Sequence, residues 1–291
     1  MNISVVPYEP LLNRVVLHFI QNQFRTHYHL DWRPVTAWLR EKTTLGVLAY
    51  SSPQTLYGAM MLSPSIKGVS WIRLFSLRDS LSTDVFNQML SQLLSLFPDA
   101  NICEVGILET ELWLRKLLDA SDFSLVDQLI HLKRSKEIPL APSISNSSII
   151  IQAATSQDLQ IVEAIDHAAF SPHWQMQMSD LREVSQYASS FTVAILDERI
   201  VGYQLSTSYP DTIHLARLAT LPAFQGRGIG SQLVQTLIQD FPHHHITVNT
   251  QGSNEVSQRL YKRLGFERQH LITPVWNLVL QSKPEPEPFT T

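Results

Sequence analysis

The chain has 291 residues, of which 44% are hydrophobic and 16% charged, and its formal net charge at pH 7 is −4. This length can form one large domain or two of ordinary size, and the composition is typical of globular rather than disordered proteins. The acidic balance argues against a general nucleic-acid-binding protein.

A linker is predicted near the middle of the chain, because two prolines and five serines fall within residues 135–148. We therefore expect one domain at 1–138, a linker at 139–148 and a second domain at 149–281. The tail at 282–291, with prolines at alternating positions, is expected to be disordered.

Strands and helices alternate in the second half. Residues 149–152 read as a strand, and Thr155 can cap a helix whose apolar face includes Leu159 and Val162. Residues 191–196 and 200–206 form a predicted hairpin, and strands follow at 215–221, 246–250 and 270–280. Helices are predicted at 231–241 and from Val256 to Gly265. The pattern predicts a mixed α/β (α+β) fold with helices packed on a sheet.

The two halves resemble a diverged repeat. Phe97 and Phe241, each followed by proline, precede strands by the same distance, and the offset is 144 (241 − 97). Gly58 and Gly202 match at the same offset, and residues 71–75 correspond to 215–219. Agreement in order and spacing over about 100 residues favours a repeat over coincidence among common residues.

The segment from Gln225 to Gly230 reads QGRGIG, follows the apolar run 215–221 and opens the predicted helix at 231–241. Alternate glycines leave backbone N–H groups bare and allow conformations that a Cβ would forbid. At a helix N-terminus such N–H groups bind anions. The loop therefore predicts a phosphate or pyrophosphate site.

Residues 218–230, LATLPAFQGRGIG, resemble the acetyl-CoA signature of the GNAT N-acetyltransferases: Gln or Arg, two residues, Gly, one residue, then Gly or Ala. A second family block follows one strand later, with Asn254, Ser257, Tyr261 and the Leu-Gly-Phe of residues 264–266. The resemblance covers residues 149–281 and implies a mixed, mostly antiparallel twisted sheet flanked by helices. It also implies acetyl-CoA as co-substrate and no metal.

The resemblance implies a role for each part of the signature. Backbone amides at 225–231 would hold the pyrophosphate of CoA, and a bulge in the preceding strand would open a gap for the pantetheine arm. The backbone of Leu218 and Thr220 would bond that arm, and the Leu218 N–H would polarise the thioester carbonyl. The implied cofactor-binding residues are Leu218, Ala219, Thr220, Gln225, Gly226, Arg227, Gly228, Ile229, Gly230, Ser231, Asn254 and Tyr261.

Tyr261 would be the general acid that protonates the departing thiolate. Its structural alternative is a buried tyrosine packed on the sheet. Asn254 would contact CoA through its side-chain amide. The alternative interpretation of Asn254 is that it only caps a helix.

The general base is missing from the pattern. Some relatives that acetylate protein N-termini carry a Glu where this chain has Asn249, and an amide cannot take a proton. A water or His214 could substitute, although His214 also fits a partly exposed strand histidine. An α-amine with a pKa near ~8 is far more often neutral at pH 7.5 than a lysine near ~10.4. The missing base therefore favours a low-pKa amine.

Two further segments have weaker signals. The segment from Asp166 to Trp174 lies where GNAT proteins place the acceptor site, but Phe170 and Trp174 could equally anchor a loop in the core. Three adjacent histidines at 243–245 cannot all face one metal ion and are interpreted as a solvated turn.

The first half of the chain lacks the glycine loop and the tyrosine of the second half. At the repeat offset, residues 222–231 fall on 78–87, which contain two aspartates and no glycine, and Tyr261 falls on Leu117 or Leu118. We expect a degenerate GNAT-like domain in a tandem arrangement. The internal repeat could replace the pairing of single-domain relatives, so both a monomer and a homodimer stay open.

Two classes of function remain. The first is an acetyl-CoA-dependent N-acetyltransferase acting on a small amine or a peptide N-terminus by direct attack on the thioester. The second is a non-catalytic acyl-CoA-binding or interaction protein. The single cysteine, Cys103, rules out an intrachain disulfide, and no apolar run reaches the ~20 residues of a membrane helix. With no signal peptide evident, we expect a cytoplasmic protein with no membrane partner.

Overall fold

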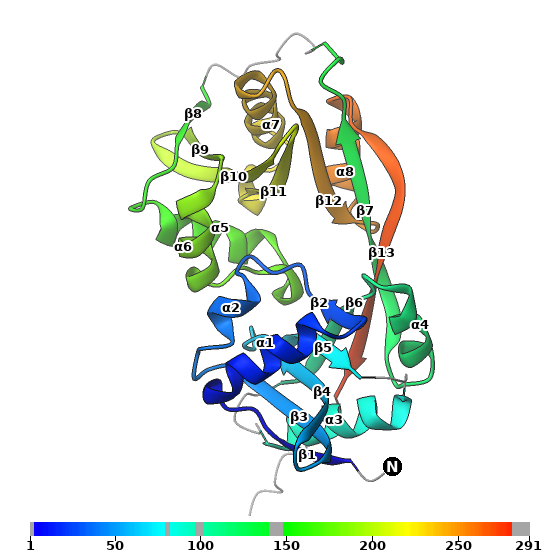
Figure 1. Cartoon of the computed structure of the whole chain (residues 1–291). Helices are drawn as coiled ribbons and strands as arrows, with labels where there is room; N and C mark the ends of the chain where they lie inside the picture. Colours follow the sequence, from blue (N-terminus) through cyan, green and yellow to red (C-terminus); the bar gives the residue numbers. More distant parts are fainter. Residues whose placement is uncertain (1–2, 79–81, 97–101, 140–147, 281–291) are drawn as a thin grey trace, which may run out of the picture. The chain divides into compact units, whose positions relative to one another are not determined.

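The computed structural model describes residues 3–78, 82–96, 102–139 and 148–280 (Figure 1). The chain divides into two compact units, Met1–Val126 with Val275–Thr291, and Asp127–Pro274. Most of the expected linker and the whole expected tail lie outside the described residues.

The first unit contains a sheet with strand order β1-β3-β4-β5-β6-β13, and β2 pairs with β5. Its helices and strands are β1 (Ser4–Pro7), η1 (Pro10–Leu12), α1 (Asn13–Gln21), β2 (Arg25–Tyr28), α2 (Val35–Trp38), β3 (Leu45–Ser52), β4 (Thr55–Leu62), β5 (Val69–Leu77), α3 (Thr83–Leu96), β6 (Glu104–Leu108), α4 (Leu112–Asp119) and the start of β7 (Ser124–Arg134).

The second unit contains the order β13-β7-β12-β11-β10-β9-β8. Its further elements are β8 (Ile150–Ala153), α5 (Leu159–Ala169), η3 (Pro172–Trp174), α6 (Met178–Tyr187), β9 (Ser190–Leu196), β10 (Arg199–Tyr209), β11 (Thr212–Thr220), η4 (Pro222–Phe224), α7 (Ile229–Asp240), β12 (His245–Gln251), α8 (Glu255–Arg263) and β13 (Glu267–Val279).

The order of elements is repeated. Three antiparallel strands are followed by helix, strand, helix and strand, as β3-β4-β5-α3-β6-α4-β7 and again as β9-β10-β11-α7-β12-α8-β13. In both copies the third strand pairs in parallel with the strand after the helix. This is the mixed, mostly antiparallel sheet flanked by helices that the sequence predicts.

The last strand of each repeat pairs outside its own repeat. In the second unit, β7 pairs antiparallel with β12, from Arg134 opposite Ile246 to Leu129 opposite Gln251. In the first unit, the end of β13 pairs antiparallel with β6. The compact units therefore differ from the expected division into 1–138 and 149–281, because a repeat in sequence does not reveal which strand pairs with which.

Two buried side chains hold these exchanged strands. In the first unit, Glu109 accepts hydrogen bonds from Trp276 Nε1 of β13 at 2.8 Å and from Arg115 Nε at 2.6 Å. In the second unit, Arg134 of β7 donates from Nε to the Leu264 carbonyl at 2.9 Å. Glu109 thus bonds directly to β13, whereas Arg134 ties β7 to the C-terminal end of α8, and such polar contacts favour one arrangement of the strands.

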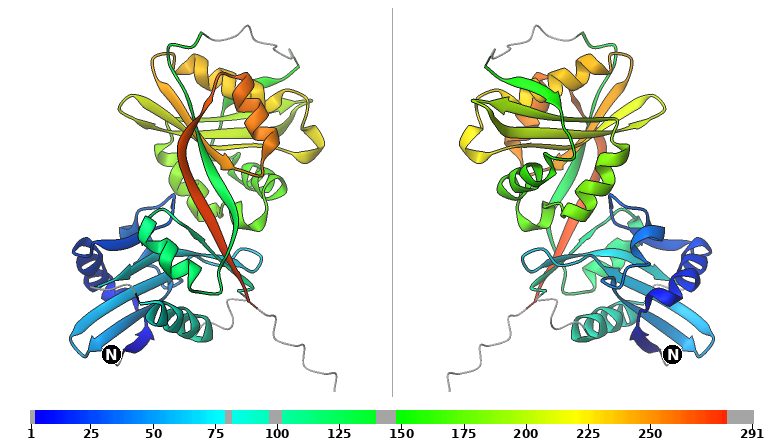
Figure 2. Two further views of the ribbon diagram at one scale, coloured as in Figure 1. Left: turned by 90° about the vertical axis from the view of Figure 1, so that its right-hand side faces the viewer. Right: turned by 90° about the vertical axis from the view of Figure 1, so that its left-hand side faces the viewer.

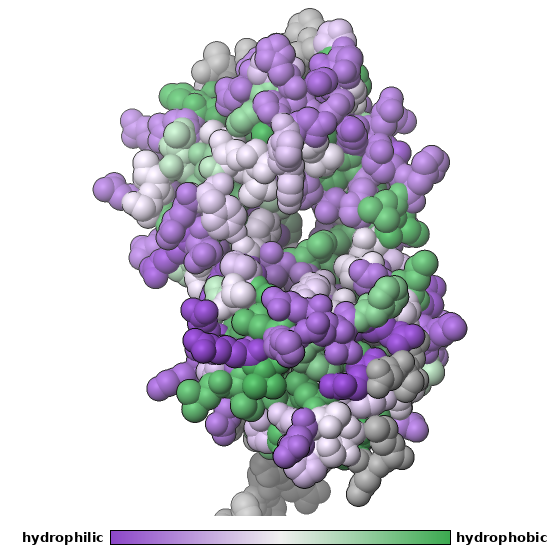
Figure 3. All heavy atoms as spheres, in the orientation of Figure 1, coloured by the Kyte–Doolittle hydropathy of each residue, from purple (hydrophilic) through white to green (hydrophobic). Residues whose placement is uncertain are grey.

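Helices α7 and α8 pack on one face of the second sheet, over a core that includes Ile213, Leu215, Val234 and Val248 (Figure 2). Helix α5 contacts β10 and β11. In Figure 3, hydrophilic side chains predominate on the visible surface of the second unit, as expected for helices whose apolar residues face a sheet. Among the described residues, no helix is both long and apolar enough to cross a bilayer.

Several local predictions are modified. The hairpin is present, with Asp197 and Glu198 in its turn at φ of 50° and 60°. The cap at Thr155 is wrong, because Thr155 donates from its N–H and hydroxyl to the Asp158 carboxylate, and α5 begins only at Leu159. Helix α7 begins at Ile229, two residues earlier than predicted.

Candidate cofactor and catalytic site

Strands β11 and β12 separate part of the way along their length. They pair in parallel only from Thr212–His245 to Leu215–Val248. At that point β11 carries a bulge: Leu215 lies opposite Ser206 and Arg217 opposite Leu205, so Ala216 is the extra residue. A bulge bends its strand and increases the local twist. The result is the gap next to the glycine loop that the sequence predicts.

The register shows which backbone groups face this gap. The Leu221 N–H donates to the Val201 carbonyl at 2.9 Å. Hydrogen-bonded and non-hydrogen-bonded pairs alternate in an antiparallel ladder, so the backbone of Ala219 faces β10, whereas Leu218 and Thr220 face away from it. Leu218 and Thr220 therefore direct polar backbone groups towards the gap, and Ala219 does not.

The glycine loop leads from this strand into α7. Gly226 and Gly228 have φ of 77° and 87°, and a Cβ added to either would meet no atom within 4 Å. Glycine is thus needed for the backbone conformation, and the space around the loop is open. Gly228 caps α7 without a side-chain hydrogen bond, which leaves the first N–H groups of the helix available to an anion.

The other loop residues have distinct positions. The side-chain amide of Gln225 donates to the Thr220 carbonyl at 3.2 Å and ties the loop to β11. The guanidinium of Arg227 lies 5.0 Å from the ring centroid of Phe224 and is exposed. The Ile229 side chain is buried, so only its backbone can contact a ligand, and Ser231 is partly buried in the first turn of α7. A Cβ on Gly230 would press on Leu260 at 3.1 Å.

Tyr261 is the buried residue of α8 and packs in the same core as Val248 and Leu218. Its ring centroid lies 5.3 Å from that of Phe266. Burial raises the pKa of Tyr261, so the hydroxyl stays protonated at neutral pH. A protonated phenol beside the strand that faces the gap can donate a proton.

Asn254 caps α8: its Oδ1 accepts from the Ser257 N–H at 3.1 Å. The alternative interpretation of Asn254 as a helix cap is therefore confirmed. Among the described residues no hydrogen bond from Asn254 Nδ2 is found, so this group can make a second contact.

The structure reveals a buried ionic network that the sequence analysis missed. Asp166 of α5 accepts from Arg217 Nη2 at 2.5 Å and Nε at 3.0 Å, and from the Tyr203 hydroxyl at 2.5 Å. Asp166 is four residues from Val162 and therefore lies on the apolar face of the predicted helix. A carboxylate on that face was the available signal, because a buried charge requires a partner.

The same network fixes the predicted acceptor-site segment. Asp166 Oδ1 accepts from the Met176 N–H at 2.8 Å, and Arg217 donates to the Trp174 carbonyl at 2.5 Å. The Arg217 guanidinium also lies 4.0 Å from the ring centroid of Phe170. The loop is therefore anchored by polar contacts to β11, rather than by burial of Phe170 and Trp174, which are both only partly buried.

The first repeat contains a counterpart of the β11 edge. Leu77 lies opposite Gly58 in the β4–β5 pair, as Thr220 lies opposite Gly202 in the β10–β11 pair. Strand β5 also has a bulge, at Arg73, and pairs with β6 only at its start. The first repeat thus preserves the strand geometry that opens a gap in the second.

Strand β2 occupies that edge in the first unit. The His29 N–H donates to the Arg73 carbonyl at 3.0 Å, and His27 lies opposite Phe75. By the same alternation, His27 and Phe75 form a hydrogen-bonded pair. The backbone groups of β5 that correspond to the gap-facing groups of β11 are therefore bonded to the protein's own chain.

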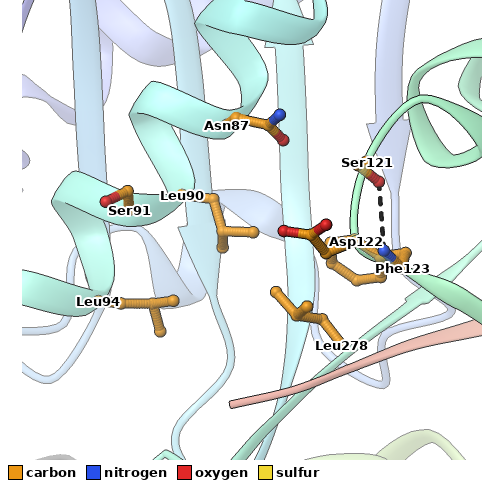
Figure 4. A pocket seen from close by; sticks show the side chains of 8 residues that line it. All are labelled: Asn87, Leu90, Ser91, Leu94, Ser121, Asp122, Phe123 and Leu278. Carbon is orange, nitrogen blue, oxygen red and sulfur yellow. Dashed lines mark hydrogen bonds between the residues drawn. The ribbon is translucent and has the colours of Figure 1, made fainter. Parts of the chain in front are cut away.

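The described part of the first unit also contains a pocket of about 300 Å³, shown in Figure 4. It lies between α3 and the turn from α4 to β7, with Leu90 and Leu94 on one side and Phe123 on the other (Figure 4). This pocket is distinct from the strand edge that β2 fills.

Comparisons with known proteins agree with this geometry. Residues 159–266 match the Acetyltransferase (GNAT) family. The chain is 30% identical over 146 residues to an uncharacterized N-acetyltransferase of Methanocaldococcus jannaschii, and the match covers 47% of this chain and 93% of that protein.

Solved structures are similar over nearly the whole chain. A tandem GNAT protein from the clavulanic acid biosynthesis pathway, solved without AcCoA, has a TM-score of 0.61 at 12% identity and covers 97% of this chain and 100% of its own. A probable N-acyltransferase from Enterococcus faecalis V583 has a TM-score of 0.68 at 8% identity, covering 96% of this chain and 72% of its own. These likenesses concern the fold, and together with the sequence matches they establish that the chain belongs to the GNAT acetyltransferase family.

Proposed function

We propose that the second repeat is an acetyl-CoA-dependent N-acetyltransferase that transfers the acetyl group to a primary amine, either a small molecule or a peptide N-terminus. The observation that carries this proposal is the separation of β11 from β12 beside the open glycine loop at the start of α7. A pantetheine arm is a chain of amides that can bond to an exposed strand edge, and a pyrophosphate suits a helix N-terminus.

Each residue then has a defined task. Backbone amides from Gly226 to Ser231 bind the pyrophosphate, with Arg227 as an exposed cation beside it. The expected contribution of the Gln225 N–H is wrong, because this group donates to the Pro222 carbonyl at 3.3 Å. The backbone of Leu218 and Thr220 binds the pantetheine amides, and the Leu218 N–H stabilises negative charge on the carbonyl oxygen. One such donor contributes ~10²–10³ in rate.

Tyr261 supplies the proton for the thiolate that leaves, and the free Nδ2 of Asn254 contacts CoA. Burial raises the pKa of Tyr261 further above that of a thiol, so the phenol is the weaker acid and its proton moves to sulfur only as the C–S bond breaks. The proposal places one donor site in the chain, since β2 fills the corresponding edge of the first unit.

The test is a calorimetric titration of acetyl-CoA into the purified chain, with stoichiometry as the readout. We expect one site per chain, lost in Gly228→Val, because φ of 87° strains a residue with a branched Cβ. The matched control is Gly68→Val, a positive-φ glycine of the first unit at 88°. Two sites per chain would refute the proposal that the first repeat does not bind acetyl-CoA. The absence of any binding would refute acetyl-CoA as the donor of the acetyl group.

The acceptor is then identified by measuring the release of free CoA from acetyl-CoA in the presence of amines that differ in pKa. Preference for α-amines over lysine side chains is expected, because far more of an α-amine is neutral near pH 7.5. Binding of acetyl-CoA with no CoA release from any amine would instead indicate a non-catalytic acyl-CoA-binding protein.

A further inference from the structure

A row of polar side chains crosses the second sheet where β11 leaves β12. His214 of β11 lies opposite Thr247 of β12, and Asn249 of β12 lies opposite His131 of β7. These residues alternate with the buried residues that pack against α7 and α8, such as Val248. Because side chains alternate across a strand, the row lies on the other face of the sheet.

The imidazole of His214 is positioned by a hydrogen bond to Thr247. Its Nδ1 lies 3.0 Å from Thr247 Oγ1. With the proton on Nδ1, the threonine hydroxyl accepts this bond, and Nε2 presents a lone pair. Within the part of the chain that the structure describes, His214 has no other hydrogen-bond partner.

The surroundings keep this imidazole neutral. Burial lowers the pKa of His214, and the neighbouring His131 lowers it further. Among the described residues, Lys133 of β7 lies opposite Thr247 on this face, and Arg217 of β11 is neutralised by its pair with Asp166 of α5. His245 of β12 lies opposite Thr212 on the same face. Burial and His131 oppose protonation of His214, so its neutral form predominates near pH 7.

The position of His214 fits a proton acceptor. It lies two residues before the bulge at Ala216 and four before Leu218, whose N–H faces the gap. Asn249 of β12 has an amide that cannot take a proton. His131 has two side-chain partners, Thr273 at 3.1 Å from Nε2 and the side chain of Asn249. His214 is thus the group in this row with an available lone pair.

We propose that His214 is the general base that takes the proton of the acceptor amine, directly or through one water, and that Thr247 is its positioning residue. This inference rests on the proposed acetyl transfer. The nitrogen lone pair forms the new C–N bond, the C–S bond breaks, and its electron pair leaves on sulfur. A protonated amine first gives one proton to His214 Nε2, which releases it to solvent. After the attack the nitrogen gives its second proton to the same atom, and the Tyr261 hydroxyl proton passes to the thiolate. Solvent then removes the proton from His214 and restores the one on Tyr261.

The experiment compares His214→Gln and Thr247→Val with His243→Gln, an exposed histidine at the turn before β12. The acceptors are trialanine, whose α-amine is largely protonated at pH 7, and hydroxylamine, which is already neutral. We expect His214→Gln to bind acetyl-CoA normally and to lose at least ~10²-fold in kcat/KM with trialanine. The loss with hydroxylamine should be about tenfold smaller, because that amine needs no prior deprotonation.

The pH profile adds a readout that a structural role would not change. With trialanine, kcat/KM of the wild type should be flat between the pKa of His214 and that of the amine near ~8. In His214→Gln it should rise tenfold per pH unit over that interval. Equal losses with both acceptors, or a loss of less than about threefold with trialanine, would overturn the proposal.

Failure of the proposed function is recognised separately. If the wild type does not bind acetyl-CoA, both the proposed acetyl transfer and the role of His214 as general base are refuted. If it binds but acetylates neither amine, ¹⁵N NMR of the imidazole decides. A neutral His214 with its proton on Nδ1, altered in Thr247→Val, supports the base. An Nε2–H tautomer, or a protonated ring at pH 7, excludes it.

Discussion

Replacing Asp166 with asparagine should destabilise the second unit more than any surface change. The carboxylate is 1% exposed and accepts four hydrogen bonds, two from Arg217 and one each from Tyr203 and Met176. The Arg217 side chain is itself only 9% exposed, so it cannot exchange its partner for water. Removing one member of a buried ion pair costs about 3–5 kcal/mol, because the other charge is left uncompensated.

The assay is urea unfolding of Asp166→Asn, with hydrogen exchange of α5 and η3 to locate the effect. Glu255→Gln is the matched control, since its ion pair with Arg259 is exposed on both sides and is worth about 0.5 kcal/mol. A double variant, Asp166→Leu with Arg217→Met, should be less destabilised than Asp166→Asn, because no charge stays buried. A loss below about 1 kcal/mol in Asp166→Asn would refute the assignment of a buried ion pair.

Two further predictions follow from burial. Tyr261→Phe should lower kcat by ~10²–10⁴ with little change in the free energy of unfolding or in acetyl-CoA affinity. The control Tyr187→Phe, at an exposed position, should leave kcat and stability unchanged. Equal kcat values for the two variants would exclude Tyr261 as the general acid. His27 and His29 have pKa values lowered by burial to about 3 and about 4, so the unfolded chain binds more protons below pH 6.5 and stability falls as the pH drops towards those values. Between pH 7.5 and pH 5, each histidine should lower the free energy of unfolding of the first unit, measured with urea, by about 2 kcal/mol. A urea midpoint that does not change with pH in this range would contradict the burial of these histidines in the neutral form.

The two repeats use the same strand edge in different ways. In the second unit the backbone of Leu218 and Thr220 faces a gap, whereas in the first unit β2 bonds to the corresponding backbone groups of β5. An unpaired strand edge is costly unless something bonds to it. We propose that what covers this edge, as much as the glycine loop, makes the second repeat active and the first repeat inactive.

The family, the repeat and the place of the glycine loop could be predicted from the amino-acid sequence. These features are local: alternating glycines before a helical pattern, and apolar periodicities that recur at one offset, depend only on neighbouring residues. Tyr261 and Asn254 could be located for the same reason, since each belongs to a short block around one helix. The predicted gap beside Leu218 also followed, because it was implied by the family resemblance.

The contacts between distant segments could not be predicted in this way and are known from the three-dimensional structure. The pairing of β7 with β12 and of β13 with β6, the filling of the β5 edge by β2 and the meeting of His214 with Thr247 all join residues from separate strands. The Asp166–Arg217 pair joins a helix to a strand 51 residues away. Alternation shows which face of a strand is apolar, but the hydrogen bonds at its edges fit many partners equally well. Packing of the whole chain selects among them.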